Sequence, residues 1–152
     1  ELDLDDLVTR EVAVVGVPPD SQVEVQVRCG SGVQVRAPEQ ELRMTVINLV
    51  ENAIKAVGRK GTVTVSTSRE SGRAVLCVKD DGCGIDPADV EKIFDPFFTT
   101  RDPGEGMGLG LALSRRTAED MGGGIEVRSR KNEGTEFIVR IPILRDSGAN
   151  GS

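Results

Sequence analysis

The sequence predicts an α+β fold, a layered sandwich in which helices cover a β-sheet. Two patterns indicate it: apolar residues alternate along several short segments, and they recur at helical spacing along others. Strands and helices that follow one another in this mixed order are typical of one sheet packed against a helical layer. A chain of 152 residues fits one domain with a buried core.

The first 37 residues are expected to form a helix and then two strands. The opening stretch "ELDLDDLVTREVAVV" spaces its apolar residues as a helix does, although residues 12–17 could equally be a strand. The segments 22–29 ("QVEVQVRC") and 32–37 ("GVQVRA") alternate with period two and meet at Gly-Ser-Gly. We therefore expect these two segments to pair as a hairpin.

A long helix is predicted over residues 39–57, because this segment opens with proline and acidic residues and stops at Gly58. Its apolar residues gather on one face, as in a helix that packs on a core. The elements expected after it are two antiparallel strands over 61–80, a short helix over 87–94, a longer helix over 109–123 and a final hairpin over 124–143.

Composition excludes several classes of function. Nineteen basic residues against 25 acidic ones give a net charge of −6, which does not provide the basic surface that nucleic acids require. No apolar stretch approaches the roughly 20 residues of a membrane span, and no signal peptide is expected. The chain has no histidine, which excludes Ser-His and Cys-His catalysis within it. Its three cysteines lack the spacing of a zinc site or a disulfide framework, so a reducing cytoplasm is the simplest setting.

Asn48, Asn52 and Lys55 form a polar stripe on the helix 39–57, nearly opposite its apolar face. A solvated helix surface is the plainer interpretation of such a stripe. Asparagine is a mediocre helix former, however, so two of them on one stripe indicate a function. Amide oxygens are hard ligands suited to Mg²⁺, and a lysine one turn away can neutralise phosphate.

Two glycine-rich stretches are candidates for ligand binding. "VKDDGCGIDP", residues 78–87, places a carboxylate before two glycines, which suits either a turn or a ligand that lies against the main chain. "GEGMGLGLAL", residues 104–113, alternates glycines directly before an apolar helix. A helix N-terminus of this kind can bind phosphate, whereas the alternative is a flexible linker.

Five boxes of the sequence occur in one family's order: "NLVENAIKAV", "DDGCGI", "FDPFFTT", "GMGLGLAL" and "GTEF". With these boxes, which span residues 48–137, the chain resembles the catalytic ATP-binding domain of bacterial sensor histidine kinases. That domain belongs to the superfamily shared with gyrase, the Hsp90 chaperones and MutL, and "FDPFFTT" is most similar to the nitrogen-regulation branch. The resemblance implies a Bergerat-type fold, a two-layer α/β sandwich whose mixed, mostly antiparallel sheet is covered by helices on one face.

The resemblance also implies the cofactors ATP and Mg²⁺. Asp80 would accept a hydrogen bond from the adenine amine, Asn52 would be the Mg²⁺ ligand, and Thr135 would reach the adenine through water. Phe94, with Phe97 and Phe98, would anchor a lid over about residues 99–108, although ordinary core packing is expected of at least one of them. The implied nucleotide-binding residues are Asn48, Asn52, Lys55, Asp80, Gly82, Gly84, Ile85, Thr100, Arg101, Gly106, Gly108, Leu109, Gly110, Leu111 and Thr135.

The resemblance leaves three activities open: a histidine kinase, an ATP hydrolase, and a degenerate module that only binds ATP. Hydrolytic relatives carry a glutamate one turn before the metal-binding asparagine, and this chain has Asn48 there. An amide cannot act as a general base, which favours the kinase. The acceptor histidine of the family lies on a separate helical hairpin, so no catalytic residue is expected in this chain.

The implied organisation has three parts. Residues 1–12 would be a connector stub from a missing dimerisation hairpin, residues 13–144 the catalytic ATP-binding domain, and residues 145–152 a disordered tail. The expected partners are the protein's own dimerisation and histidine phosphotransfer domain and, through the full-length protein, a response regulator. Neither nucleic acid nor membrane contact is expected of this domain, which should be a cytoplasmic monomer when excised from a parent that can itself be membrane-anchored.

Overall fold

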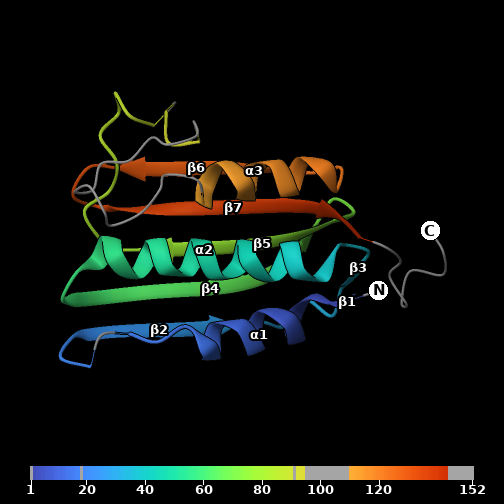
Figure 1. Cartoon of the computed structure of the whole chain (residues 1–152), viewed down its shortest axis with the longest axis horizontal. Coiled ribbons are helices and arrows are strands. Elements are labelled where there is room, and N and C mark those ends of the chain that lie inside the picture. The colour runs from blue at the N-terminus through green and yellow to red at the C-terminus, as the bar shows by residue number, and fades with distance from the viewer. Residues whose placement is uncertain (1, 18, 91, 95–109, 144–152) are drawn as a thin grey trace.

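The computed structural model describes residues 2–17, 19–90, 92–94 and 110–143. Within these ranges the chain forms three helices and seven strands (Figure 1). In order they are β1 (Leu2–Asp3), α1 (Leu4–Val14), β2 (Gln22–Arg28), β3 (Gln34–Val35), α2 (Glu39–Val57), β4 (Lys60–Glu70), β5 (Arg73–Asp80), α3 (Gly110–Asp120), β6 (Gly124–Arg130) and β7 (Gly134–Pro142). None of the helices in the described part is long and apolar enough to cross a membrane.

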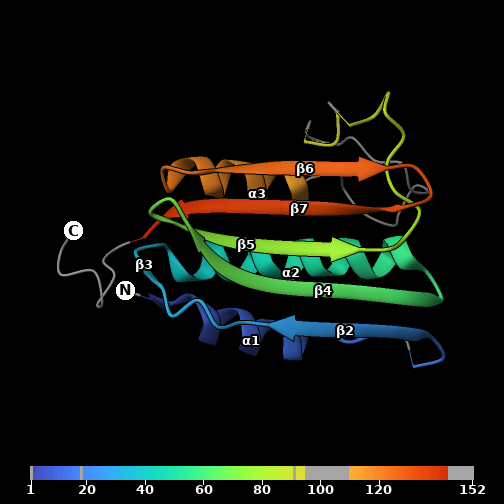
Figure 2. The ribbon, with the colours of Figure 1, turned by 180° about the vertical axis from the view of Figure 1, so that it is seen from behind.

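A five-stranded sheet forms one layer, with the strand order β2-β4-β5-β7-β6. β2 and β4 run parallel, whereas β4–β5, β5–β7 and β6–β7 are antiparallel. The three helices lie side by side on one face, and Figure 2 shows the opposite face without a helix. The predicted two-layer α+β sandwich with a mixed, mostly antiparallel sheet is confirmed.

The expected hairpin between segments 22–29 and 32–37 is wrong. β2 pairs in parallel with β4, and β3 pairs with β1. The loop between β2 and β3 is directed toward α1, because Asp5 accepts hydrogen bonds from the Ser31 hydroxyl (2.7 Å) and from the Gly32 amide (2.8 Å). A contact between residues 26 positions apart therefore overrides the local turn signal of Gly-Ser-Gly.

The short helix expected over residues 87–94 is also absent from the described part of that segment, which consists of turns. The Asp89 amide donates to the Asp86 carbonyl and the Lys92 amide to the Asp89 carbonyl, both at 2.8 Å. These bonds span three residues, as in isolated turns, rather than the four of an α-helix. The Asp86 carboxylate accepts from the Ala88 amide (2.9 Å), which stabilises the first turn.

The helices predicted over residues 39–57 and at the start of the chain are confirmed as α2 and α1. Residues 12–14 continue α1, so the strand alternative for 12–17 is wrong. α1 and α2 both bury apolar residues in the same core that covers the sheet. The boundary expected between residues 12 and 13 falls inside α1, whose Leu4, Leu7 and Val8 are almost fully buried.

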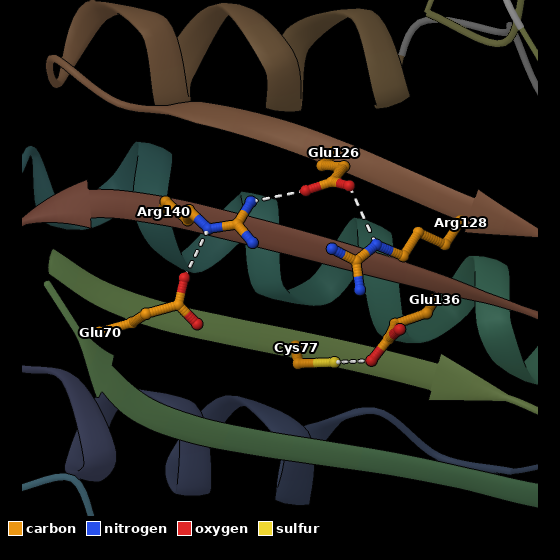
Figure 3. Close-up of polar contacts among 6 residues, drawn as sticks. All are labelled: Glu70, Cys77, Glu126, Arg128, Glu136 and Arg140. Carbon is orange, nitrogen blue, oxygen red and sulfur yellow. Dashed lines mark hydrogen bonds and ion pairs between the residues drawn. The ribbon is translucent and has the colours of Figure 1, made fainter.

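The helix-free face of the sheet carries a lattice of charged side chains (Figure 3). The Arg140 guanidinium lies 2.7 Å from Glu126 and 3.4 Å from Glu70, and Arg128 lies 2.9 Å from Glu126. Beside them the Cys77 thiol donates to the Glu136 carboxylate at 2.9 Å. Burial, together with the neighbouring Glu136 carboxylate, raises the pKa of Cys77 to about 12, so this cysteine stays a thiol at neutral pH.

Asp5 should make stability depend on pH. Burial raises the pKa of this carboxyl, but hydrogen bonds from Thr67, Gly32 and Ser31 outweigh burial, and the net shift of its pKa is downward. A carboxyl with a depressed folded pKa stabilises the fold above its unfolded pKa of about 3.9, and this contribution is lost as pH falls through the folded pKa. We expect Asp5→Asn to lower the free energy of unfolding at pH 7 by about 1–2 kcal/mol, and by less below pH 4.

Urea denaturation at pH 7 and at pH 3 measures this difference. Asp6→Asn is the matched control, because Asp6 lies in the same helical turn but is exposed and pairs with Arg10 on the surface. It should change the free energy of unfolding by less than about 0.5 kcal/mol. Equal losses for Asp5→Asn at both pH values would contradict the assigned role of the Asp5 carboxylate.

Candidate functional site

A row of polar side chains crosses one end of the helix-covered face of the sheet. Asp80 on β5 pairs with Thr135 on β7, and Thr135 pairs with Ser129 on β6. Paired residues on neighbouring strands point to the same face, so the three side chains lie side by side. The adjacent row on this face, two residues further along each strand, is apolar and consists of Val78, Phe137 and Val127. The polar row therefore marks the point where the apolar core ends.

Asp80 is a buried carboxylate, with only 4% of its surface exposed. Its Oδ1 accepts a hydrogen bond from the Gly82 amide at 2.9 Å. Burial raises the pKa of this carboxyl, an effect opposed by hydrogen bonds from the backbone of Gly82 and Thr135 and strengthened by the negative charge of Asp81. A buried acceptor of this kind favours a ligand that donates a hydrogen bond, because a second acceptor there would lie against it without a proton.

The loop that follows Asp80 is held between α2 and the β6–β7 turn. The Cys83 amide donates to the Ala56 carbonyl in the last turn of α2 (3.2 Å), and the Asn132 amide donates to the Cys83 carbonyl (2.6 Å). A Cβ on Gly82 would lie 2.3 Å from the Ala56 carbonyl oxygen, and one on Gly84 would lie 2.1 Å from that of Arg130. Both glycines are thus required by close backbone packing, whatever ligand approaches the loop.

Asp81 determines where the chain leaves the sheet. Its amide donates to the Thr62 carbonyl at 3.3 Å, but the Thr62 amide donates to the Asp81 side chain at 2.8 Å rather than to its backbone. The carboxylate thereby takes the place of the next backbone carbonyl in the β4–β5 ladder. A Cβ on Gly61 would come within 2.6 Å of this carboxylate, so the glycine leaves room for it.

Ser129 is a residue of this site that sequence reasoning missed. Its Oγ accepts from the Ile85 amide (2.8 Å), and it also lies 3.0 Å from the Gly134 carbonyl and 2.9 Å from the Thr135 hydroxyl. It therefore joins the loop after β5 to the start of β7. Aligning the two strands of the predicted hairpin 124–143 in their antiparallel register would have placed Ser129 opposite Thr135.

The predicted polar stripe lies on α2, with Asn48 and Asn52 half-buried and Lys55 exposed. The next residue after Lys55 is Ala56, whose carbonyl holds the loop after Asp80. The C-terminal end of α2 and the C-terminal tip of β5 lie at the same end of the molecule (Figure 1). The first turn of α3 is the part of that helix nearest to this end. Gly110 and Leu111 form the start of α3, and Leu111 packs against the core.

Some predicted residues fall outside the described part of the chain. These are Thr100, Arg101, Gly106, Gly108 and Leu109, together with Phe97, Phe98 and the lid segment. Phe94 is described, and its ring meets that of Phe137 edge to face at 6.3 Å between centroids. The Arg115 guanidinium lies over the Phe94 ring, 5.3 Å from its centroid. Core packing, the alternative considered for the phenylalanine cluster, is thus confirmed for Phe94.

Comparison with known proteins places this arrangement in a family. A family model described as histidine kinase-, DNA gyrase B-, and HSP90-like ATPase matches residues 37–145. Sensor histidine kinase ZraS of Salmonella typhi is 36% identical over 148 residues, which cover 94% of this chain and 31% of ZraS. Sporulation kinase C of Bacillus subtilis is 33% identical over 116 residues, covering 76% of this chain and 27% of that kinase. The chain thus spans about a third of the length of these relatives.

Solved structures show the same fold. A solved chain of the mycobacterial sensor histidine kinase MprB superposes with a TM-score of 0.83 at 26% identity, covering 93% of this chain and 97% of that solved chain. Full-length ShkA, solved in complex with AMPPNP, superposes with a TM-score of 0.81 at 28% identity, covering 93% of this chain and 30% of ShkA. ZraS and MprB are sensor histidine kinases, and this chain belongs with them to the family of histidine kinase-, DNA gyrase B- and HSP90-like ATPases.

Proposed function

We propose that this chain binds Mg-ATP and donates the γ-phosphoryl group to a histidine on a separate dimerisation domain, in two-component signal transduction. The observation that carries the proposal is the buried carboxylate of Asp80 at the polar end of the sheet face. Membership of an ATPase family and a structural neighbour solved with AMPPNP support nucleotide binding.

Asp80 would select adenine. The exocyclic amine of adenine donates hydrogen bonds, and the free acceptor capacity of the buried Asp80 carboxylate can take one of them. Guanine has a carbonyl oxygen at the same ring position, which would lie against the carboxylate without a proton between them. Such a mismatch in a desolvated site discriminates strongly between bases. Gly82, Gly84 and Ile85 would line the ring, and Thr135 would reach it through water.

The α2 stripe would hold the phosphate end of the nucleotide. Mg²⁺ bound to a nucleotide keeps phosphate and water ligands and needs only one or two protein oxygens, which suits the single amide of Asn52. The bound ion would supply neutralisation of phosphate charge. Asn48 and Lys55 lie on the same side of α2; Asn48 would be a polar neighbour of the phosphates, and Lys55 would contact them. The further nucleotide-binding residues proposed are Thr100, Arg101, Gly106, Gly108, Leu109, Gly110 and Leu111.

A kinase is favoured over a hydrolase because Asn48 stands where hydrolytic relatives have a glutamate. An amide cannot take a proton from water, so water should attack the γ-phosphate slowly. Phosphoryl transfer otherwise needs positioning and charge neutralisation rather than covalent help from the protein. The acceptor histidine and a response regulator would be supplied by or through the rest of the full-length protein, and we place this domain in the cytoplasm.

Phosphate transfer tests the whole proposal. The full-length protein, incubated with Mg²⁺ and γ-³²P-labelled ATP, should acquire an acid-labile label on a histidine outside this chain. Release of inorganic phosphate without a labelled histidine would indicate a hydrolase. Bound ATP with neither product would indicate a regulatory binding module.

Asn52→Ala should weaken ATP binding mainly when Mg²⁺ is present. Loss of the amide oxygen removes a metal ligand, so the dissociation constant in Mg²⁺ should rise by about tenfold or more from a micromolar starting value. In chelator the change should be much smaller. Glu51→Ala, an exposed neighbour on α2, is the control and should alter neither value. An equal loss with and without Mg²⁺ would refute the metal-ligand role.

Asp80→Asn should abolish the preference for ATP over GTP. The amide oxygen can still accept from the Gly82 amide, which leaves the NH₂ group to face the base as a donor. Calorimetric titration with both nucleotides would measure the ratio of affinities, with the exposed Asp86→Asn as control. A ratio unchanged from that of the original protein would exclude Asp80 as the residue that reads the base.

A further inference from the structure

We infer that Ser129 is a positioning residue for base recognition: it directs the hydroxyl proton of Thr135 away from the ligand, so that the polar row offers the base only hydrogen-bond acceptors. Ser129 acts through Thr135 and does not itself touch the nucleotide. The inference deepens the proposed nucleotide binding and rests on it.

Hydrogen-bond counting around the Ser129 hydroxyl gives the direction of each bond. A serine hydroxyl has one proton to donate and two lone pairs that accept. The Ile85 amide, at 2.8 Å, can only donate, so it uses one lone pair. The Gly134 carbonyl, at 3.0 Å, can only accept, so it takes the proton. One lone pair remains for the third neighbour.

That third neighbour is the Thr135 hydroxyl, at 2.9 Å from the Ser129 Oγ. Because the proton of Ser129 is already donated to Gly134, the Thr135 hydroxyl must donate its own proton to Ser129. The opposite arrangement would leave the Ser129 oxygen 3.0 Å from the Gly134 carbonyl oxygen with no proton between them, which is unfavourable. Thr135 is only 5% exposed, so water cannot easily replace these partners.

The consequence concerns what the site presents to a base. With its proton committed to Ser129, Thr135 keeps only lone pairs for a ligand or a bridging water. Asp80, which pairs with Thr135 across β5 and β7, is a carboxylate and also only accepts. Two adjacent acceptors match the two protons of an exocyclic amine, directly or through water. They reject a carbonyl oxygen at the same position.

Ser129 also has a structural role, because its hydroxyl accepts the hydrogen bond from the Ile85 amide in the loop after β5. This role is distinct from the orientation of the Thr135 hydroxyl. Loss of the hydroxyl releases the Ile85 amide, and this weakens the loop whichever nucleotide binds. It should therefore lower the affinity for all nucleotides alike. Freeing the Thr135 proton changes only the relative affinity for amine and carbonyl bases, so the ratio of affinities reports the positioning role.

Inosine triphosphate is the matched probe, because it replaces the adenine amine by a carbonyl and keeps the sugar and phosphates. Calorimetry with ATP and inosine triphosphate in Mg²⁺ should show a clear preference for ATP in the original protein. In Ser129→Ala the ratio of the two affinities should fall about tenfold, since Thr135 can then donate to the inosine carbonyl. Ser129→Thr keeps the hydroxyl and should restore the ratio, and Ser68→Ala on the exposed end of β4 should not change it.

A double-mutant cycle tests whether Ser129 acts through Thr135. Thr135→Val removes the hydroxyl, so adding Ser129→Ala to it should leave the ATP to inosine triphosphate ratio unchanged. Additive effects on the ratio, or an unchanged ratio in Ser129→Ala alone, would overturn the inference. If Ser129→Ala does not fold, Ser129→Cys replaces it and should lower the ratio of the affinities for ATP and inosine triphosphate by a smaller factor. An unchanged ratio in Ser129→Cys would also overturn the inference. An original protein without preference for ATP would instead contradict the proposed adenine recognition.

Discussion

The register of the central antiparallel strands is the constraint on which the site depends. Along β5 and β7, residues that face the helices alternate with residues that face solvent, and a slip by one residue would exchange the two sets. The apolar pair Val78 and Phe137 must face the helical layer to be buried. Two residues further along, the same alternation brings Asp80 and Thr135 to that face. Core packing thus places a carboxylate where burial would otherwise disfavour it.

Three neighbouring elements then fix the loop that leaves this row. The pairing with β4 ends at Asp81, whose carboxylate accepts a hydrogen bond from the Thr62 amide. The Cys83 amide donates to the Ala56 carbonyl in the last turn of α2. On the other side, Ser129 holds Ile85. The backbone near Asp80 is therefore anchored to β4, to α2 and to the final hairpin. Such preorganisation would make the proposed base recognition by Asp80 selective, because the site cannot relax around the wrong ligand.

Local signals in the sequence predicted the elements that depend on local physics. Pro38 and Gly58 bound α2 as expected, and Gly58 has the positive φ (71°) that makes glycine favourable at a helix end. The expected hairpin failed because of a distant contact: the β2–β3 loop is hydrogen-bonded to Asp5, which lies in α1. Motif boxes indicated Asp80 and Thr135, whereas Ser129 lay in no box and was found only through strand pairing.

The helix-free face of the sheet explains why the functional residues gather at one end of the other face. Val75 and Ile138 point to the helix-free face, yet both are buried, because the long side chains of the lattice around Arg140 and Glu126 lie across that face. One face of the sheet is therefore covered by helices and the other is charged and exposed to solvent, as is common for antiparallel sheets. A ligand that needs desolvated, preorganised groups must then enter between the helices and the sheet. Along that interface the row next to the Asp80 row is apolar, so the proposed base-recognising groups, Asp80 and Thr135, lie where the apolar core ends.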